Sequence, residues 1–590
     1  INAQSNKYLF VILPKVKIYL TKMKLLFRNK YFWLLLLVCS FTLLPFLGLS
    51  DFHTKGEPRE AIVSYTMLSG DNWVLPTNMG GETAYKPPFF HWCVALASSV
   101  YGSVTEATSR IPSAVALLIM TMATFAFFAK RKGNKIGIIT ALTAFTSFEI
   151  HRAGGNCRVD MVLTMLTVCA IYDLMRWYEH NMKGIPWIAI VLMGLGTMTK
   201  GPVGSIIPCM VMGIFMLMRK MNFFRAFFTL FAFGLLSLLI YGAWFYAAYR
   251  QGGQSFLDLM YEENVGRMTN TMNYDSCVNP WPYNFLTVFT GYLPWVLLLI
   301  TTLFFVRWNF KKKINLKSIW NDVLGMDNVD LYSLIAIVSI FVFYCIPQSK
   351  RSVYLMPIYP FLAYFIAKLL VWLSDSQQKP LRIYGGILSV LSSLLFVVFV
   401  LIKSGVAPLT ILGGHGKHAI TNIATMQAFA NIGSWWQYVL ILATTIIGLA
   451  WWRYQKRNNG DKLVYGIIVL TFALYLSVDG VYTPAALNVK SQRPVAECID
   501  RIAPESKGKI YEYIDYAIRT PGDKPHFFEL NYYLNNRVHN FYNEKPQSGF
   551  LVITHSDYVM CVNGFKKQGY KFKFIKNWAE FDMDLYQFNK

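Results

Sequence analysis

The feature that most constrains this chain is a succession of apolar stretches, each close to twenty residues long, separated by short polar segments. A helix needs about 20 apolar residues to cross the hydrocarbon core of a bilayer. We predict thirteen such helices, at residues 31–50, 108–129, 136–150, 160–177, 186–200, 203–219, 226–249, 283–306, 331–347, 353–374, 381–403, 434–452 and 462–482. Since 54% of the residues are hydrophobic and only 15% charged, the composition argues against a soluble or disordered protein.

The positive charges indicate how these helices are oriented. The formal net charge is +24, but most lysines and arginines lie in short clusters between apolar stretches, as at 130–135, 307–313 and 453–457. That distribution is typical of cytoplasmic loops of membrane proteins and not of a nucleic-acid-binding face. With the N-terminus inside, the inner segments carry more than twice as many lysines and arginines as the outer loops. We therefore predict a cytoplasmic N-terminus and an external C-terminus.

Three regions follow from this topology. Residues 1–30 form a cytoplasmic tail, in which Met23 resembles a natural start and 1–22 are expected to precede the native chain. Residues 31–482 form the membrane domain, with a long first outer loop at 51–107. Within that loop, 89–103 is apolar but too short to span, so we expect a helix lying in the interface. Residues 483–590 alternate β-rich runs with polar turns and predict an external α/β domain.

The first outer loop carries candidate chemistry. Gly56 is followed by Glu57, Pro58 and Arg59, a combination that predicts a helix start because proline and acidic residues suit the first turn. Glu57 and Arg59 would then lie near the positive end of an interfacial helix, although from spacing alone helix capping and snorkelling are the simpler explanation of both. Lys86 precedes two prolines and an apolar segment. It could bind a phosphate or simply anchor the loop at the interface.

Other outer segments repeat this pattern of charge. Arg158 and Asp160 stand at the start of a predicted span, where a buried charge is costly and therefore a functional candidate. Asp160 could instead cap that helix. Lys200 interrupts two apolar stretches, Arg267 follows an acidic segment, and Lys350 lies between two later spans. Cations beside carboxylates at interface depth favour a phosphate-bearing lipid as the ligand.

The sequence resembles a known superfamily in several ordered motifs, namely GEPREAIVSYTMLSGDNWVLP, AYKPPFFHW, ATSRIPSA, RVDM, TKGPVG, SKRSVYLMPIYP and LNVKSQRPVA. These are similar to the bacterial GT-C glycosyltransferases of the aminoarabinose (lipid A) transferase and protein O-mannosyltransferase superfamily, over roughly residues 30–500. The resemblance implies a polytopic α-helical membrane protein with a C-terminal periplasmic α/β domain. It also implies inverting transfer of a sugar from a polyprenyl (undecaprenyl) phosphate carrier to a lipid A-like or other acceptor, at the periplasmic face of the bacterial inner membrane.

The resemblance also assigns residues. It implies that Glu57 and Asp160 are catalytic, that Arg59, Lys86 and Arg267 bind the donor phosphate, and that Lys200 and Lys350 are further candidates for that role. The chain departs from the family at Gly56, where an acidic residue usually precedes Glu57, so that Glu57 must act alone. It departs again at Thr83 and Tyr85, where the aminoarabinose transferases carry an aromatic residue and a glutamate. These departures argue against aminoarabinose as the sugar.

We expect no cofactor, no metal and no nucleic-acid partner, because the cations already neutralise a leaving phosphate. The spacing of His415 and His418 leaves a metal pair as an alternative. Two other functions remain open. A transporter or flippase for a lipid-linked sugar would need ionisable residues at mid-span, and an inactive GT-C homologue would account for the missing acidic residue.

Overall fold

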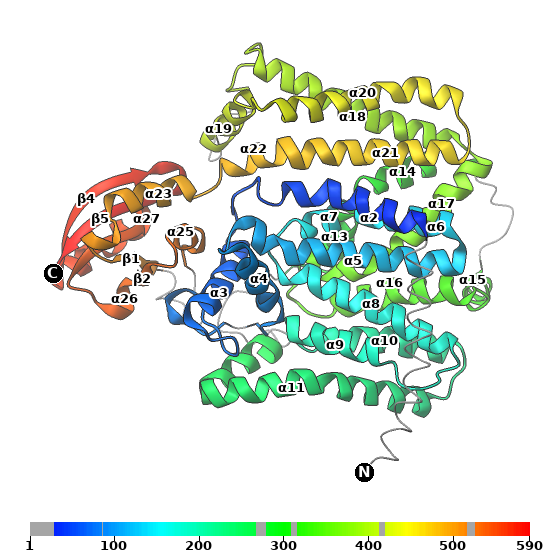
Figure 1. Cartoon of the computed structure of the whole chain (residues 1–590), viewed down its shortest axis with the longest axis horizontal. Coiled ribbons are helices and arrows are strands. Elements are labelled where there is room, and N and C mark those ends of the chain that lie inside the picture. The colour runs from blue at the N-terminus through cyan, green and yellow to red at the C-terminus, as the bar shows by residue number, and fades with distance from the viewer. Residues whose placement is uncertain (1–28, 85, 267–278, 308–314, 412–418, 516–525) are drawn as a thin grey trace.

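The computed structural model describes residues 29–84, 86–266, 279–307, 315–411, 419–515 and 526–590. Long helices lie side by side in one bundle, and a small sheet domain formed by the C-terminal residues lies at one end of it (Figure 1). The candidate residues Arg267, His415 and His418 fall outside the described residues.

Among the described residues, seven helical segments are long and apolar enough to cross a membrane. An eighth is added if the bent pair α13 and α14, which meet at 96°, counts as one span. The bundle helices are α2 (Lys30–Leu43), α5 (Glu106–Lys132), α6 (Asn134–Phe145), α8 (Val159–Glu179), α9 (Trp187–Lys200), α10 (Val203–Met218), α11 (Phe223–Tyr261), α13 (Tyr283–Gly291), α14 (Trp295–Phe305), α16 (Asn328–Cys345), α17 (Tyr359–Ser376), α18 (Lys379–Lys403), α20 (Trp435–Arg457) and α21 (Asp461–Ser477).

All thirteen stretches predicted to span are helical. Eight of them correspond to the segments that meet the length and apolarity criterion. The other five correspond to α2, α6, α8, α9 and α10, which are shorter or, in α8, interrupted by charge. Much of α6 and α8 is buried among other helices, so these elements depend on packing as well as on apolar length. The chain is therefore a multi-pass membrane protein.

Two helices of the first outer loop cover one end of the bundle. The predicted helix start at Gly56 is confirmed by α3 (Gly56–Gly70), with Glu57 in its first turn. The predicted non-spanning helix is α4 (Phe89–Tyr101), only 13 residues long. Its inner face buries Phe90 and Val94, while Leu96 and Val100 are exposed on the other. Both helices lie beside the C-terminal domain (Figure 1).

The C-terminal domain is an α/β unit, as the β-rich runs predict. Its sheet has the order β2-β1-β3-β5-β4, with β1 parallel to β2 and β3, and β5 antiparallel to β3 and β4. The strands are β1 (Ile510–Tyr513), β2 (Val538–Asn540), β3 (Ser548–Thr554), β4 (Lys571–Trp578) and β5 (Met583–Asn589). The helices around them are α23 (Arg493–Ile502), α25 (Phe528–Tyr533), α26 (Phe541–Glu544) and α27 (His555–Lys567). The membrane domain leads into this unit through α22 (Thr483–Asn488).

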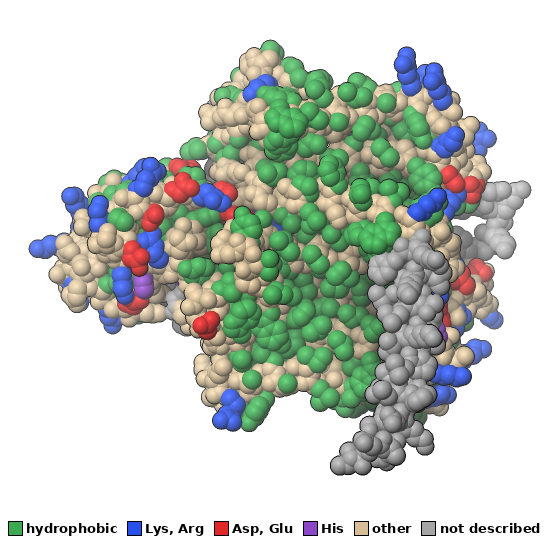
Figure 2. Space-filling model, in the orientation of Figure 1, with side chains coloured by type: hydrophobic (Ala, Val, Ile, Leu, Met, Phe, Trp, Pro, Cys, Tyr) green, Lys and Arg blue, Asp and Glu red, His purple; other side chains and the backbone are tan. Residues whose placement is uncertain are grey.

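The surface of the bundle separates apolar from charged side chains. In Figure 2 hydrophobic side chains cover most of the visible bundle, while charged side chains gather at its ends and on the C-terminal domain. Among the bundle helices, Leu239 of α11 is 67% exposed and Phe304 of α14 is 73% exposed. Exposure of large apolar side chains on this scale indicates a surface facing lipid tails.

Candidate functional site

Glu57 forms a buried ion pair with Arg110 of α5. Arg110 donates from Nε to Oε1 (2.9 Å) and from Nη2 to Oε2 (3.2 Å), and the Cys157 backbone N–H donates to Oε1 (2.8 Å). Both side chains of the pair are almost fully buried, with about 1% of each residue exposed. Burial opposes ionisation of Glu57, but the Arg110 guanidinium holds its pKa below the usual value. This carboxylate ties the start of α3 to the bundle.

Glu60 lies one helical turn further along α3 and contacts different residues from those that contact Glu57. Its Oε1 pairs with the Lys86 ammonium and lies 3.3 Å from Arg59 Nη2, and its Oε2 lies 2.8 Å from His91 Nε2. Glu60 is 3% exposed. It therefore fixes Lys86 against α3 and α4.

The Glu60 cluster has uncommon acid–base properties. Burial opposes ionisation of Glu60, but Lys86, His91 and Arg59 together hold its pKa well below the usual range. Burial also acts on Lys86, and with Arg59 it lowers the pKa of that ammonium to about 8, in spite of Glu60 and Asp160. Glu60 is thus a carboxylate that stays ionised, while the pKa of Lys86 is lowered to about 8.

Asp160 does not cap its helix. The residue at the start of α8 binds the Lys200 ammonium at the end of α9, and Lys86 and Arg158 are close enough to act on its charge. The Lys200 ammonium lies 4.3 Å from the centroid of the Tyr354 ring. Four chain segments, in α3, α8, α9 and 350–354, thus converge on one charged cluster.

Lys350 and Arg351 are two more cations in the segment that reaches this cluster, since they precede Tyr354. Lys350 is only 6% exposed, yet its ammonium has no hydrogen-bond or ion-pair partner among the described residues. The Arg351 Nε is likewise buried without a hydrogen-bond partner in the described part of the chain. We refer to Arg59, Lys86, Arg158, Lys200, Lys350 and Arg351, with Glu60 and Asp160, as the cation cluster.

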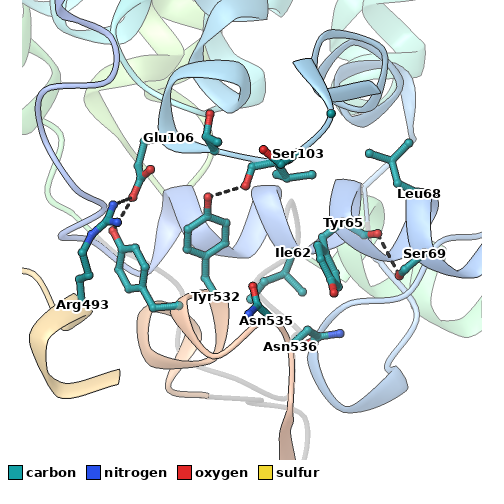
Figure 3. A pocket seen from close by; sticks show the side chains of 14 residues that line it. Ile62, Tyr65, Leu68, Ser69, Ser103, Glu106, Arg493, Tyr532, Asn535 and Asn536 are labelled. Carbon is teal, nitrogen blue, oxygen red and sulfur yellow. Dashed lines mark hydrogen bonds and ion pairs between the residues drawn. The ribbon is translucent and has the colours of Figure 1, made fainter. Parts of the chain in front are cut away.

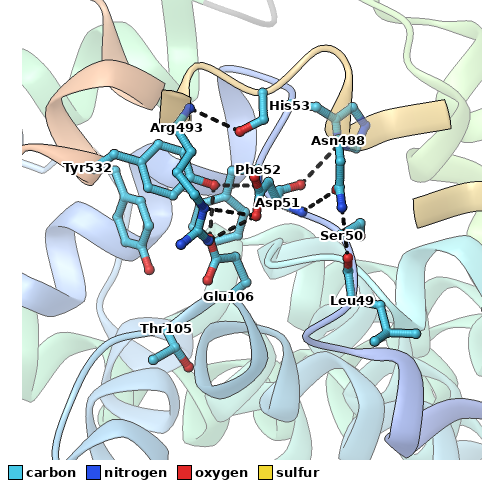
Figure 4. Close-up of polar contacts among 12 residues, drawn as sticks. Leu49, Ser50, Asp51, Phe52, His53, Thr105, Glu106, Asn488, Arg493 and Tyr532 are labelled. Carbon is cyan, nitrogen blue, oxygen red and sulfur yellow. Dashed lines mark hydrogen bonds and ion pairs between the residues drawn. The ribbon is translucent and has the colours of Figure 1, made fainter. Parts of the chain in front are cut away.

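The C-terminal domain holds the first outer loop in place. Arg493 lies 2.9 Å from Asp51 Oδ1 and also pairs with Glu106 (Figure 4). Its guanidinium carbon lies 4.7 Å from the centroid of the Tyr533 ring. Asn488 adds a bond from the Asp51 N–H to its Oδ1 (2.9 Å). These contacts fix the backbone that leads into α3.

A cavity of about 500 Å³ lies beside this junction, between α3, the loop before α5 and α25 (Figure 3). Tyr65, Ser103 and Asn535 line it, and its charged groups, Glu106 and Arg493, are paired with each other. It therefore lacks the uncompensated positive charge that a phosphate would need.

The structure brings most of the predicted residues together. Arg59 and Lys86 both contact Glu60, and Lys200 contacts Asp160. Lys86 is close enough to Asp160 to act on its charge, and Lys350 lies in the segment that contacts Lys200. Sequence reasoning assigned no role to Glu60, His91, Arg110 or Arg351. Glu60 follows Glu57 by three residues, and helical spacing was the available signal for it. No group of three or more His, Cys, Asp or Glu able to hold a metal occurs in the described ranges.

Comparison with known proteins places this geometry in context. The family model described as dolichyl-phosphate-mannose-protein mannosyltransferase matches residues 85–246. The undecaprenyl phosphate-α-4-amino-4-deoxy-L-arabinose arabinosyl transferase 1 of Pseudomonas fluorescens is 24% identical over 63% of this chain and 63% of its own length. The corresponding transferase of Pseudomonas savastanoi pv. phaseolicola is 26% identical over 68% of this chain and 75% of its own. The chain thus spans less than two thirds of the length of the first of these relatives.

A solved structure extends the likeness to the fold. The crystal structure of ArnT from Cupriavidus metallidurans bound to undecaprenyl phosphate superposes with a TM-score of 0.68 at 16% identity, covering 95% of this chain and 98% of that one. The chain therefore has the GT-C fold. The predicted resemblance to the aminoarabinose transferase and protein mannosyltransferase superfamily, whose members are glycosyltransferases, is confirmed.

Proposed function

We propose that this chain, with its GT-C fold and its similarity to the aminoarabinose transferases, transfers a sugar from a polyprenyl phosphate carrier to a lipid acceptor. The observation that carries the proposal is the cation cluster, above all Lys350, a lysine only 6% exposed whose ammonium has no anionic partner among the described residues. A phosphate at this position would supply the missing negative charge. The similarity of relatives named for undecaprenyl phosphate supports that carrier.

The cluster suits a displacement in which a phosphate leaves. As the bond between the anomeric carbon and the carrier phosphate breaks, its electron pair passes to the phosphate, which gains negative charge. Positively charged donors fixed before the reaction stabilise that charge, and removing one such donor commonly costs about 10²–10³ in rate. We assign this role to Lys86 and Lys350, with Arg59, Lys200 and Arg267 as further phosphate ligands.

The carboxylates take separate roles in this proposal. Glu60 and Asp160 hold Lys86 and Lys200 in the orientation that the phosphate requires. Glu57, which the resemblance implies to be catalytic, positions α3 through Arg110 instead of reaching the reacting atoms. The proposed domains are the cytoplasmic tail 1–30, the membrane catalytic domain 31–482 and the periplasmic domain 483–590, with the site at the periplasmic face of the inner membrane.

Transfer in proteoliposomes tests the proposal. The purified full chain would be given a panel of undecaprenyl-phosphate sugars and a bacterial envelope lipid extract, and sugar in the lipid fraction would be measured. We expect Lys350→Ala and Lys86→Ala to lower the rate by about 10²-fold or more. Lys462→Ala, an exposed lysine outside the cluster, is the matched control. No turnover of any donor by folded wild-type protein would refute the proposal.

A further inference from the structure

The tip of the first outer loop reaches into the core of the C-terminal domain. Residues 76–84, which we refer to as the loop turn, fold back on themselves with an antiparallel bridge between Thr77 and Thr83. Met79 within the turn is only 1% exposed. It belongs to a buried apolar cluster that also contains, from the C-terminal domain, Ile499 of α23, Leu530 of α25 and Val538 of β2. The C-terminal domain therefore holds the loop turn.

A buried histidine connects the loop turn to the sheet of the C-terminal domain. His526 Nδ1 shares a hydrogen bond with Glu512 of β1, and the Phe527 N–H donates to the other carboxylate oxygen of Glu512 (3.0 Å). The second ring nitrogen, His526 Nε2, lies 3.5 Å from Oε2 of Glu82 in the loop turn. His526 and Glu512 are 6% and 3% exposed. The imidazole thus lies between a carboxylate of the C-terminal domain and a carboxylate of the first outer loop.

This imidazole is a cation at neutral pH. Burial disfavours the charged ring, but the hydrogen bonds and negative charges of Glu512 and Glu82 raise the pKa of His526 to about 9. A protonated ring has two N–H donors and can serve both carboxylates at once. Since desolvation offsets much of the attraction within a buried ion pair, such a contact adds little stability over an apolar one. Its main effect is on geometry, because it fixes where Glu82 lies.

The loop turn leads directly to Lys86 of the cation cluster. Ala84 is 5% exposed and packs in one buried apolar cluster with Met67 of α3. Two residues later, the Lys86 ammonium pairs with Glu60 of α3. On its other side, Lys86 is followed by two prolines and then by α4. The backbone of Lys86 is therefore held from one side by α4 and from the other by the loop turn.

We propose that His526 is a positioning residue of the transferase, which acts through Glu82 on the segment that carries Lys86. This inference rests on the proposed function and gives the C-terminal domain a part in binding the carrier phosphate. The imidazolium fixes the loop turn, and the loop turn presents the Lys86 ammonium in the cation cluster. Loss of this contact lets the Lys86 backbone shift, and a displacement of about 1 Å in a catalytic site can cost about 10²-fold in rate.

Binding of undecaprenyl phosphate to the full chain in detergent, measured by native mass spectrometry, tests this role. His526→Gln removes the positive charge, and Glu82→Gln removes its partner in the loop turn. We expect each variant to bind the lipid about fivefold more weakly than wild type, and the double variant to bind no more weakly than either, because both changes break one contact. His555→Gln is the matched control and should bind like wild type. His555 also lies beside a carboxylate of the C-terminal domain, 2.9 Å from Asp584, but is exposed at the start of α27.

A double-mutant cycle with Lys86 separates positioning from a general effect on the domain. If His526 acts through Lys86, His526→Gln should change the affinity of the Lys86→Ala protein by less than about twofold. A general loss of domain structure would weaken binding by the same factor in both backgrounds. Equal factors would therefore overturn the inference, and so would wild-type affinity in both His526→Gln and Glu82→Gln.

The cycle can also be run from the loop side of the contact. The Glu82 side chain is 27% exposed, so Glu82→Gln disturbs the core less than a change at His526 and decides the question where His526→Gln fails to fold. A wild-type protein that does not bind undecaprenyl phosphate would refute the proposed function, and this inference with it.

Discussion

Replacing Glu57 with glutamine separates a positioning role from a catalytic one. The Glu57 carboxylate accepts two hydrogen bonds from Arg110 and one from the Cys157 N–H, and about 1% of each partner of the ion pair is exposed. Glu57→Gln removes the anion and leaves the Arg110 cation buried. Breaking a buried ion pair from one side costs about 3–5 kcal/mol. At slightly less than about 1 °C per kcal/mol for a chain of this length, the midpoint of thermal unfolding should fall by about 3–4 °C.

The assay is thermal unfolding of the purified protein in detergent, followed by transfer activity per folded molecule. We expect Glu57→Gln to lose stability and to retain most of its activity per folded molecule. The double variant Glu57→Gln with Arg110→Met should recover part of the stability, because it removes both buried charges. A Glu57→Gln protein that unfolds like wild type but has no activity would refute this reasoning and return Glu57 to the catalytic role implied by the family resemblance.

Other predictions concern pH and the junction between the domains. Since the pKa of Lys86 is lowered to about 8, undecaprenyl phosphate binding should weaken as the pH rises from 7 to 9, and Lys86→Arg should abolish this pH dependence in a titration of binding. Burial, together with the charge of Glu57, raises the pKa of Glu529 to about 7. The protonated carboxyl therefore stabilises the folded protein. This contribution is complete below the pKa of Glu529 in the unfolded chain and is lost as the pH rises through 7. Glu529→Gln should therefore raise the unfolding midpoint at pH 8 and leave it nearly unchanged at pH 4.5. Arg493→Ala removes the contacts to Asp51 and Glu106, and limited proteolysis should cut between α22 and α23 faster than in wild type; an unchanged cleavage rate would contradict the role of this junction.

Much of the fold could be predicted from apolar length alone. Every predicted span is a helix, because a run of apolar residues in a bilayer has few alternatives that satisfy its backbone. The short helix α4 was also anticipated, since its 13 residues cannot cross a bilayer. The exact number of crossings was harder to infer. Helices such as α6 and α8 are buried by their neighbours, so their own hydropathy does not report whether they span.

The cations of the site were predicted better than its carboxylates. Lys86 stands directly before Pro87, and Lys200 stands two residues before Pro202 between apolar segments, a local signal that a single sequence displays. The partner of Glu57 is Arg110, 53 residues away, and no sequence pattern near either residue indicates that they pair. Glu60 was passed over for a similar reason, because its role depends on Lys86 and His91, which only the tertiary fold brings to it.

Undecaprenyl phosphate binding to wild type, Lys350→Ala and Lys462→Ala at pH 7 tests the central claim most directly. We predict that wild type and Lys462→Ala bind the lipid alike, and that Lys350→Ala binds it at least tenfold more weakly. Lys350→Ala should unfold at a temperature close to that of wild type, because the Lys350 ammonium forms no ion pair with the described residues. Equal affinity in all three proteins would contradict the assignment of the cation cluster to the carrier phosphate.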